Sequence, residues 1–281
     1  MSSLSQSPLS RNLAAIPRQM LMLLMVIGAL VPIYFVVVTA LKTPNEYIFN
    51  KWGLPSELTI ENVGRLLTEG NHLRWLLNSL LISTISVALG VLVASLMAYG
   101  FARYTFPGKN ALFIVVTSLL VLSPVVLIIP LFKTMVALHL QNTYPAAIVI
   151  YTGIMLPIST YLLTSFFKSI PPEIIDAALI DGCSSFRIFS QIMLPLSRPA
   201  VLTAAFTNWL YVWNEILIAL IFLQDDKMRT LMAGLVLFKG KYTTDIPLTM
   251  AGVAIAIIPT FVLYLFGQQY FVRGLTAGAV K

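Results

Sequence analysis

Residues 75–100 read WLLNSLLISTISVALGVLVASLMAYG and contain no charged side chain. A helix of about 20 mostly apolar residues is long enough to cross the hydrocarbon core of a bilayer. Inside a bilayer the backbone must satisfy its own hydrogen bonds, so a continuous apolar stretch predicts a helix. We therefore predict a transmembrane helix from Trp75 to Gly100. Small residues that favour close helix packing recur in it every fourth position: Ser86, Gly90, Ala94 and Ala98.

Other stretches of the chain have the same apolar character, and each is bounded by charged residues, proline or glycine. Transmembrane β-strands would give short segments of alternating hydrophobicity, whereas these stretches are continuous. The sequence therefore predicts an all-α polytopic membrane protein with six transmembrane helices. Besides Trp75–Gly100, the predicted spans are Gln19–Leu41, Ala111–Phe132, Ala146–Phe167, Ala200–Leu223 and Pro247–Val272.

The composition agrees with this class. Of the 281 residues, 58% are hydrophobic and 10% are charged, with 18 Lys and Arg against 11 Asp and Glu. Soluble domains carry roughly 25% charged residues, and the mean hydropathy of this chain is +0.87. These values exclude an ordinary water-soluble domain and a disordered chain. With one cysteine, two histidines and no run of Lys or Arg, we predict no metal site and no nucleic-acid partner.

Six spans place both ends of the chain on one side of the membrane. Lys and Arg divide evenly between the two sides, so their number does not decide the orientation. The short connection that carries Arg103 and Lys109 favours a cytoplasmic location of the termini. We predict a cytoplasmic N-terminal tail over residues 1–18, a transmembrane domain over 19–272, and a cytoplasmic C-terminal tail over 273–281.

The connection between the fourth and fifth predicted spans, residues 169–198, contains PPEIIDAALIDGCSSFRIFSQIMLP at 171–195. Proline and acidic residues suit the first turn of a helix, and Gly182 can adopt the left-handed conformation that ends one. Ser184 or Ser185 can cap a second helix, which Pro195 limits. The second helix has an apolar face formed by Phe186, Ile188, Phe189 and Ile192. This face either docks a partner protein or packs on the chain's own spans or the lipid interface.

This connection resembles the EAA loop of ABC importer permeases. Asp176-Ala177-Ala178, Gly182, Ile192 and Leu194-Pro195 stand at the spacing of that motif, with Asp176 where the family usually has glutamate. Further segments are typical of the carbohydrate-uptake branch, and the C-terminal one is similar to the end of its maltose-type second permease. They are Asn78-Ser79-Leu80, 98–103 (AYGFAR) with 106–109 (FPGK), Trp213-Asn214-Glu215, and 274–281 (GLTAGAVK).

The resemblance implies a mechanism. Two permease subunits pair in the inner membrane with two ATPase subunits, and an extracytoplasmic sugar-binding protein delivers the substrate. The EAA loop is a cytoplasmic coupling helix, which places both termini in the cytoplasm. ATP and Mg would be bound by the ATPases, since this chain has no G-x-x-x-x-G-K-[ST] phosphate loop; it binds no cofactor and is no enzyme. The implied coupling residues are Asp176, Ala177, Ala178, Asp181, Gly182, Ser185, Phe186, Arg187, Phe189, Ile192, Leu194 and Pro195.

Polar side chains lie on one face of the fifth predicted span. At 100° per residue they fall within an arc of about 140°, and Trp209 and Trp213 point away from it. Ionisable groups inside a span are functional hypotheses by default, so we predict a substrate pathway here. The alternative, which the residues favour equally, is interhelical hydrogen bonding that fixes the packing. The predicted pathway residues are Thr207, Asn208, Tyr211, Asn214 and Glu215, and Thr203 shares their face.

An ion-coupled secondary transporter, working without ATPase subunits, is the other functional class to weigh. Such carriers tend to have inverted repeats and several intramembrane charges. This sequence has one clear intramembrane carboxylate and no evident duplication. The sequence therefore favours the ATP-driven importer, and the family resemblance implies a disaccharide or oligosaccharide as the substrate.

Overall fold

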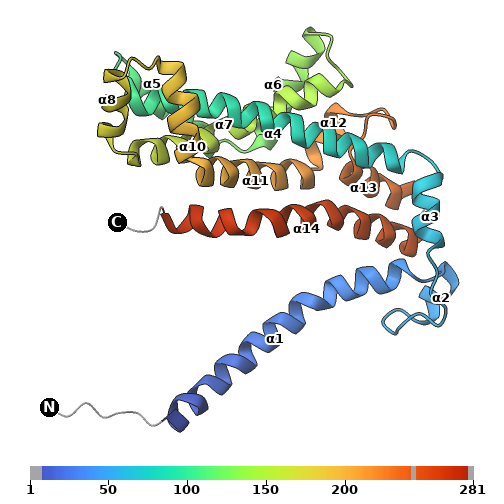
Figure 1. Cartoon of the computed structure of the whole chain (residues 1–281). Helices are drawn as coiled ribbons and strands as arrows, with labels where there is room; N and C mark the ends of the chain where they lie inside the picture. The colour runs from blue at the N-terminus through green and yellow to red at the C-terminus, as the bar shows by residue number, and fades with distance from the viewer. Residues whose placement is uncertain (1–7, 242–244, 278–281) are drawn as a thin grey trace. The chain divides into compact units, whose positions relative to one another are not determined.

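The structure is a computed structural model that describes residues 8–241 and 245–277, with the side chains of residues 17–237 and 245–268. All regular secondary structure in these residues is helical (Figure 1). The chain divides into two compact units, one of residues 1–69 and 238–255 and the other of residues 70–237 and 256–281. The predicted all-α class is thereby confirmed.

The first unit is built on the ends of two long helices. Its apolar cluster joins Ala40 at the end of α1 to Leu66 of α3 and to Leu248 and Ala251 at the start of α14. The Arg65 guanidinium reinforces this cluster with an ion pair of 2.9 Å to Asp245. The elements of this unit are α1 (Pro8–Ala40), α2 (Pro44–Phe49), α3 (Glu61–Thr68), the end of α13 (Leu231–Lys241) and the start of α14 (Ile246–Ala277).

The second unit is organised around α4 (His72–Arg103) and α7 (Tyr144–Ser169), which form its most extensive helix pair and run alongside each other (Figure 1). The predicted stripe of small residues lies in this contact. A Cβ added to Gly90 would lie 3.3 Å from Cε of Met155, so glycine permits the close approach. The remaining elements are α5 (Lys109–Ser118), α6 (Pro124–Ala137), α8 (Pro172–Ile180), α9 (Ser185–Ile188), α10 (Leu194–Leu196), α11 (Arg198–Asn214) and α12 (Leu217–Phe222).

Four of the predicted spans are continuous helices that are long and apolar enough to cross a membrane. In the part of the chain that the structure describes, these are Pro17–Ala40, His72–Arg103, Tyr144–Ser169 and Ile246–Gln268. They correspond to the first, second, fourth and sixth predicted spans. Helix α1 begins at Pro8 and α14 ends at Ala277, so both helices extend into the segments predicted as tails; residues 1–7 and 278–281 lie outside the described residues.

The third predicted span, Ala111–Phe132, is not a straight helix. Helix α5 continues through a 3₁₀ turn to Val121, and α6 then leaves at an angle of 106°. Ser123 precedes Pro124 and takes an extended conformation (ψ 133°), because a residue before proline is disfavoured in the helical region. Pro124 in turn starts α6, a position that suits proline. The prediction of one continuous helix here was wrong.

The fifth predicted span, Ala200–Leu223, is also interrupted. Helix α11 ends at Asn214, and the short α12 begins at Leu217. The prediction of a continuous helix is therefore wrong at Glu215, whose role is described below. With two interrupted segments, the number of six membrane crossings stays a prediction.

Asn78 joins α4, α7 and the α12–α13 connection at one end of the second unit. Its amide Nδ2 donates to the carbonyl oxygens of Lys227 (3.0 Å) and Arg229 (2.8 Å), and its Oδ1 accepts from Tyr144 Oη (2.8 Å). All of the side chain's strong hydrogen-bonding groups are thus engaged in tertiary contacts.

We expect Asn78→Ala to lower the free energy of unfolding by about 1–3 kcal/mol, because it leaves partly buried polar groups without their partner. Asn214→Ala is the matched control, since the Asn214 amide is exposed and donates only to Leu210 of its own helix. Denaturant unfolding of the two variants in the same detergent is the measurement. Equal losses in both variants would contradict this account of Asn78.

Candidate functional site

The predicted glycine elbow between two short helices is present. Gly182 has a φ of 76°, a left-handed conformation that glycine adopts without the steric cost of a Cβ. The N–H of Cys183 donates to Ala178 O (2.9 Å), and the N–H of Gly182 donates to Leu179 O (3.0 Å). This pair of bonds is the Schellman arrangement that closes a helix C-terminus. It confirms the predicted end of the first helix.

Ser184 starts the second helix. Its Oγ accepts from the N–H of Arg187 at 3.4 Å, so Ser184 rather than Ser185 is the cap. Helix α9 then passes into a π-helical turn at Phe189–Met193 and continues as α10 to Leu196. The helix therefore ends one residue beyond Pro195, close to the limit that the sequence predicted.

The apolar face of this second helix mostly packs on the chain's own spans. Ile188 and Phe189 are 1% and 3% exposed, and they lie in a cluster with Leu163 and Phe167 of α7 and Ala98 of α4. Ile192 is partly buried against the same cluster, whereas Phe186 is 73% exposed. Of the two interpretations of this face, packing on the spans therefore holds for Ile188, Phe189 and Ile192, and only Phe186 remains open to a partner.

Two polar side chains at the end of α4 tie the loop to the spans. Tyr99 Oη donates to the carbonyl oxygen of Ser185 (3.2 Å). Arg103 Nη2 donates to the carbonyl oxygens of Phe167 and Ile170, each at 2.8 Å, where α7 ends and the loop begins. Both residues belong to the segment 98–103. This segment resembles the family in sequence, but the sequence predicted no structural role for it. Together they hold both halves of the loop against the α4–α7 pair.

The predicted coupling residues form two groups, one buried or half-buried and one exposed. Ala178 and Phe189 are buried, and Ile192 and Leu194 are half-buried, so these hold the loop on the spans. The others face outward and are available for contact with another protein. The exposed members are Asp176, Ala177, Asp181, Gly182, Ser185, Phe186, Arg187 and Pro195.

Sequence reasoning missed three exposed apolar residues of α8. Ile174, Leu179 and Ile180 are 42%, 54% and 86% exposed, while the buried residues of this helix are Ile175 and Ala178. A signal was present, because the segment EIIDAALI has more apolar residues than one face of a two-turn helix can bury. With Phe186, these residues form the exposed apolar set of the loop.

Three of the predicted pathway residues line one cavity. Thr207, Asn208 and Tyr211 of α11 face a space of about 250 Å³ whose other walls include Met155 and Pro157 of α7. Asn208 is buried, and its Nδ2 donates to Ser159 Oγ of α7 at 2.7 Å. The amide of Asn208 therefore serves interhelical packing, whereas the exposed side chains of Thr207 and Tyr211 face the cavity.

Glu215 terminates α11 and starts α12 instead of lining the cavity. Its carboxylate accepts from the backbone N–H groups of Leu217 (2.8 Å), Ile218 (3.0 Å) and Ala219 (3.3 Å). Tyr151 Oη of α7 donates to the same carboxylate at 2.7 Å. These are the N–H groups that a new helix leaves without an intrahelical acceptor. The geometry therefore supports a structural reason for a carboxylate in the fifth predicted span.

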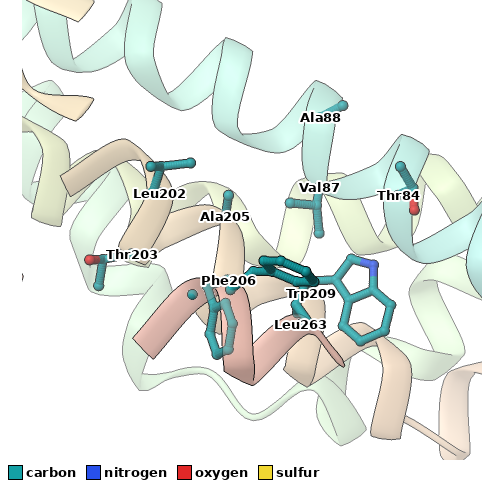
Figure 2. A pocket seen from close by; sticks show the side chains of 11 residues that line it. Thr84, Val87, Ala88, Leu202, Thr203, Ala205, Phe206, Trp209 and Leu263 are labelled. Carbon is teal, nitrogen blue, oxygen red and sulfur yellow. The ribbon is translucent and has the colours of Figure 1, made fainter. Parts of the chain in front are cut away.

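The opposite face of α11 is apolar. The rings of Trp209 and Trp213 stack with centroids 4.7 Å apart, and Trp213 Nε1 donates to Ala256 O of α14 (3.2 Å). A second cavity, of about 450 Å³, lies on this side between α4, α11 and α14. Figure 2 shows Trp209 and Phe206 among the side chains that line it, with Val87 and Leu263 on either side of these rings. The prediction that the tryptophans point away from the polar face is confirmed, although Thr203 lines this apolar cavity instead of the cavity with Thr207 and Tyr211.

Residues 86–276 match the profile of a family described as the binding-protein-dependent transport system inner membrane component. The chain belongs to this family. It is an ABC importer permease, and it therefore spans the inner membrane several times. The matched region contains both the loop and α11.

Relatives of this permease align over nearly its whole length. The arabinooligosaccharides transport system permease protein AraQ of Halalkalibacterium halodurans is 36% identical over 90% of this chain and 91% of its own. The melibiose/raffinose/stachyose import permease protein MelC of Bacillus subtilis is 32% identical over 89% and 91%. A chain from the crystal structure of a bacterial ABC transporter involved in the import of alginate superposes with a TM-score of 0.82, at 18% identity, over 96% of this chain and 100% of that chain. At that identity the superposition shows a shared fold.

Among the described residues of the permease, no three His, Cys, Asp or Glu side chains form a group that could hold a metal ion. The absence of a metal or cofactor on this chain stays a prediction, as does the functional role of each coupling and pathway residue.

We expect Glu215→Ala to lower the stability of the permease by about 1–3 kcal/mol, because it removes the acceptor of backbone N–H groups that the start of α12 leaves without an intrahelical partner. Glu215→Gln keeps one acceptor oxygen at the same distance from the backbone, so the loss of stability in this variant should be smaller. The melting temperatures of both variants in lipid nanodiscs provide the comparison. If the melting temperature falls as far in the Gln variant as in the Ala variant, the negative charge and not the hydrogen bonding is the essential property.

Proposed function

We propose that this permease forms part of the transmembrane pathway of an ATP-driven importer for a carbohydrate, a disaccharide or an oligosaccharide. The observation that carries the proposal is the near full-length similarity to permeases named for arabinooligosaccharides and for melibiose, raffinose and stachyose. The substrate crosses by alternating access. The chain has no phosphate loop, so separate ATPase subunits bind ATP and Mg and carry out the hydrolysis, and the permease itself is not an enzyme.

The partners of the permease in this proposal are a second permease, two ATPase subunits and an extracytoplasmic sugar-binding protein. The loop at residues 169–198 meets an ATPase subunit in the cytoplasm, and both termini of the chain lie on that side. The exposed apolar set of the loop supports this assignment, because Ile180 and Phe186 are 86% and 73% exposed and Ile174 and Leu179 beside them are also exposed. Apolar side chains exposed together commonly mark a protein contact.

Thr207 and Tyr211 are the proposed contacts for the sugar. Their side chains are exposed and line the same cavity on the polar face of α11. Hydroxyl groups can replace water around the hydroxyls of a passing sugar, and a few such groups favour transit over tight binding. Asn208 and Glu215 support this cavity through their contacts with α7.

The transport experiment uses the complete complex in proteoliposomes with the binding protein and labelled oligosaccharides. We expect uptake with ATP and none with a non-hydrolysable analogue. Tyr211→Phe and Thr207→Val should change the dependence of uptake on the sugar, because each removes one hydroxyl from the cavity while preserving shape. Thr84→Val, on the wall of the apolar cavity, is the control and should behave as the native permease does. Uptake that persists without ATPase subunits would refute the proposal.

We expect Gly182→Val to weaken the attachment of the ATPase. A side chain at this position has open space around it, so the cost is backbone strain of roughly 1–2 kcal/mol from the left-handed conformation. Gly182→Asn is the matched control, because asparagine tolerates that conformation. Copurification of the ATPase and the rate of uptake are the readouts. Normal attachment and uptake in the Val variant would show that the elbow does not shape the contact.

A further inference from the structure

The connection between α1 and α3, residues 41–60, has a fixed shape that is organised by one buried cation. Lys42 is fully buried, and its Nζ donates to the carbonyl oxygens of Asn50 (2.7 Å) and Gly53 (2.6 Å). A buried ammonium group is costly unless its hydrogens are bound. The carbonyl groups therefore fold around Lys42, which draws the middle of the connection back to the end of α1.

Further hydrogen bonds hold both ends of this connection. Asn62 of α3 is buried, and its Nδ2 donates to the carbonyl oxygens of Ala40 (2.9 Å) and Lys42 (2.8 Å). Within the connection, Asn50 Oδ1 accepts from the N–H of Gly53 at 2.8 Å. The polar side chains of Lys42, Asn50 and Asn62 thus bind the backbone of the connection, whereas the charged side chains of Lys51 and Glu57 are exposed.

The large apolar side chains of the connection are directed outward. Their exposed fractions range from 62% for Ile48 to 92% for Phe49. Such a concentration on a segment held by internal hydrogen bonds is unusual for a surface in contact with water and marks an interaction site. This apolar surface consists of Ile48, Phe49, Trp52, Leu54, Leu58 and Ile60.

Two contacts join Trp52 to α1 more than one turn before the end of that helix. Tyr34 Oη donates to the carbonyl oxygen of Trp52 at 2.9 Å, and the rings of Phe35 and Trp52 lie 4.9 Å apart. Phe35 precedes the end of α1 by more than one turn, or roughly 8 Å at the rise of an α-helix. The apolar part of α1, Pro17–Ala40, has 24 residues, so it extends some distance beyond a hydrocarbon core of about 30 Å. Trp52 therefore lies near the edge of that core.

We propose that the α1–α3 connection is an interfacial membrane anchor, with its apolar surface inserted among the lipid acyl chains. The apolar surface continues the exposed apolar side of α1, to which Trp52 is joined through Tyr34 and Phe35. Tryptophan and tyrosine favour this level of a bilayer, and exposed Lys51 beside Trp52 can reach the lipid phosphates. The proposal requires only a membrane-embedded α1 and is independent of the sugar.

The test measures what surrounds Phe49 in the assembled importer in liposomes. A nitroxide is attached to Phe49→Cys in a Cys183→Ser background, and its collision rates with oxygen, which concentrates in lipid, and with a water-soluble nickel chelate are compared. We expect oxygen to dominate at position 49. Thr68→Cys, at the exposed polar end of α3, is the control and should favour the nickel chelate. The collision rates are measured without sugar or ATP. Their result therefore does not depend on whether the transport proposal is correct.

Either of two results would overturn the anchor. Dominance of the nickel chelate at position 49 would place the connection in water. Shielding from both reagents would mean that another subunit or the binding protein covers the surface. Leu58→Cys gives the same reading from the other end of the connection, and it decides the matter if Phe49→Cys does not assemble. Quenching by brominated lipids provides a label-free check, since Trp52→Phe should remove part of the quenched tryptophan fluorescence.

Discussion

A backbone N–H group inside a bilayer has no water to bind, and this constraint governs where the helices of the permease can stop. The interruption between α11 and α12 exists because the Glu215 carboxylate accepts from the first N–H groups of α12, while Tyr151 fixes the carboxylate from α7. The bend before α6 uses another solution, because Pro124 has no N–H to satisfy. The cavity with Thr207 and Tyr211 is lined in part by the residues at the bend before α6. The hydroxyl groups of Thr207 and Tyr211 and the amide of Asn208 are the polar part of a cavity whose other walls are mostly apolar.

The loop at residues 169–198 is attached to the α4–α7 pair by apolar and polar contacts together. Phe189 is buried against α7 and α4, and Arg103 binds the carbonyl oxygens at the end of α7. These contacts lie on the second short helix and on the segment that precedes the first, so the loop is fixed to the spans at both places. The exposed side chains, among them Ile180 and Phe186, are left for the proposed contact with the ATPase.

In each of the two units, a buried polar side chain holds a connection between helices in place. Asn78 joins a helix start to a distant connection in the second unit, and Lys42 does the same for the α1–α3 connection in the first. Each replaces hydrogen bonds that the backbone would otherwise make to water. The two connections differ in what they expose. The α1–α3 connection turns its apolar side chains outward, to the proposed lipid contact.

The sequence by itself determined the helical class, the position of four spans, the glycine elbow and the family, because these follow from local length, hydrophobicity, φ preference and motif spacing. It also placed Thr207, Asn208 and Tyr211 on one face through helical periodicity. Only the tertiary structure decided that Phe189 packs inward while Ile180 stays exposed, since burial depends on which spans lie nearby. Periodicity also assumes an unbroken helix, so it placed Glu215 in the pathway. The carboxylate ends that helix because Tyr151, 64 residues away in sequence, lies next to it, and no local pattern records such a neighbour.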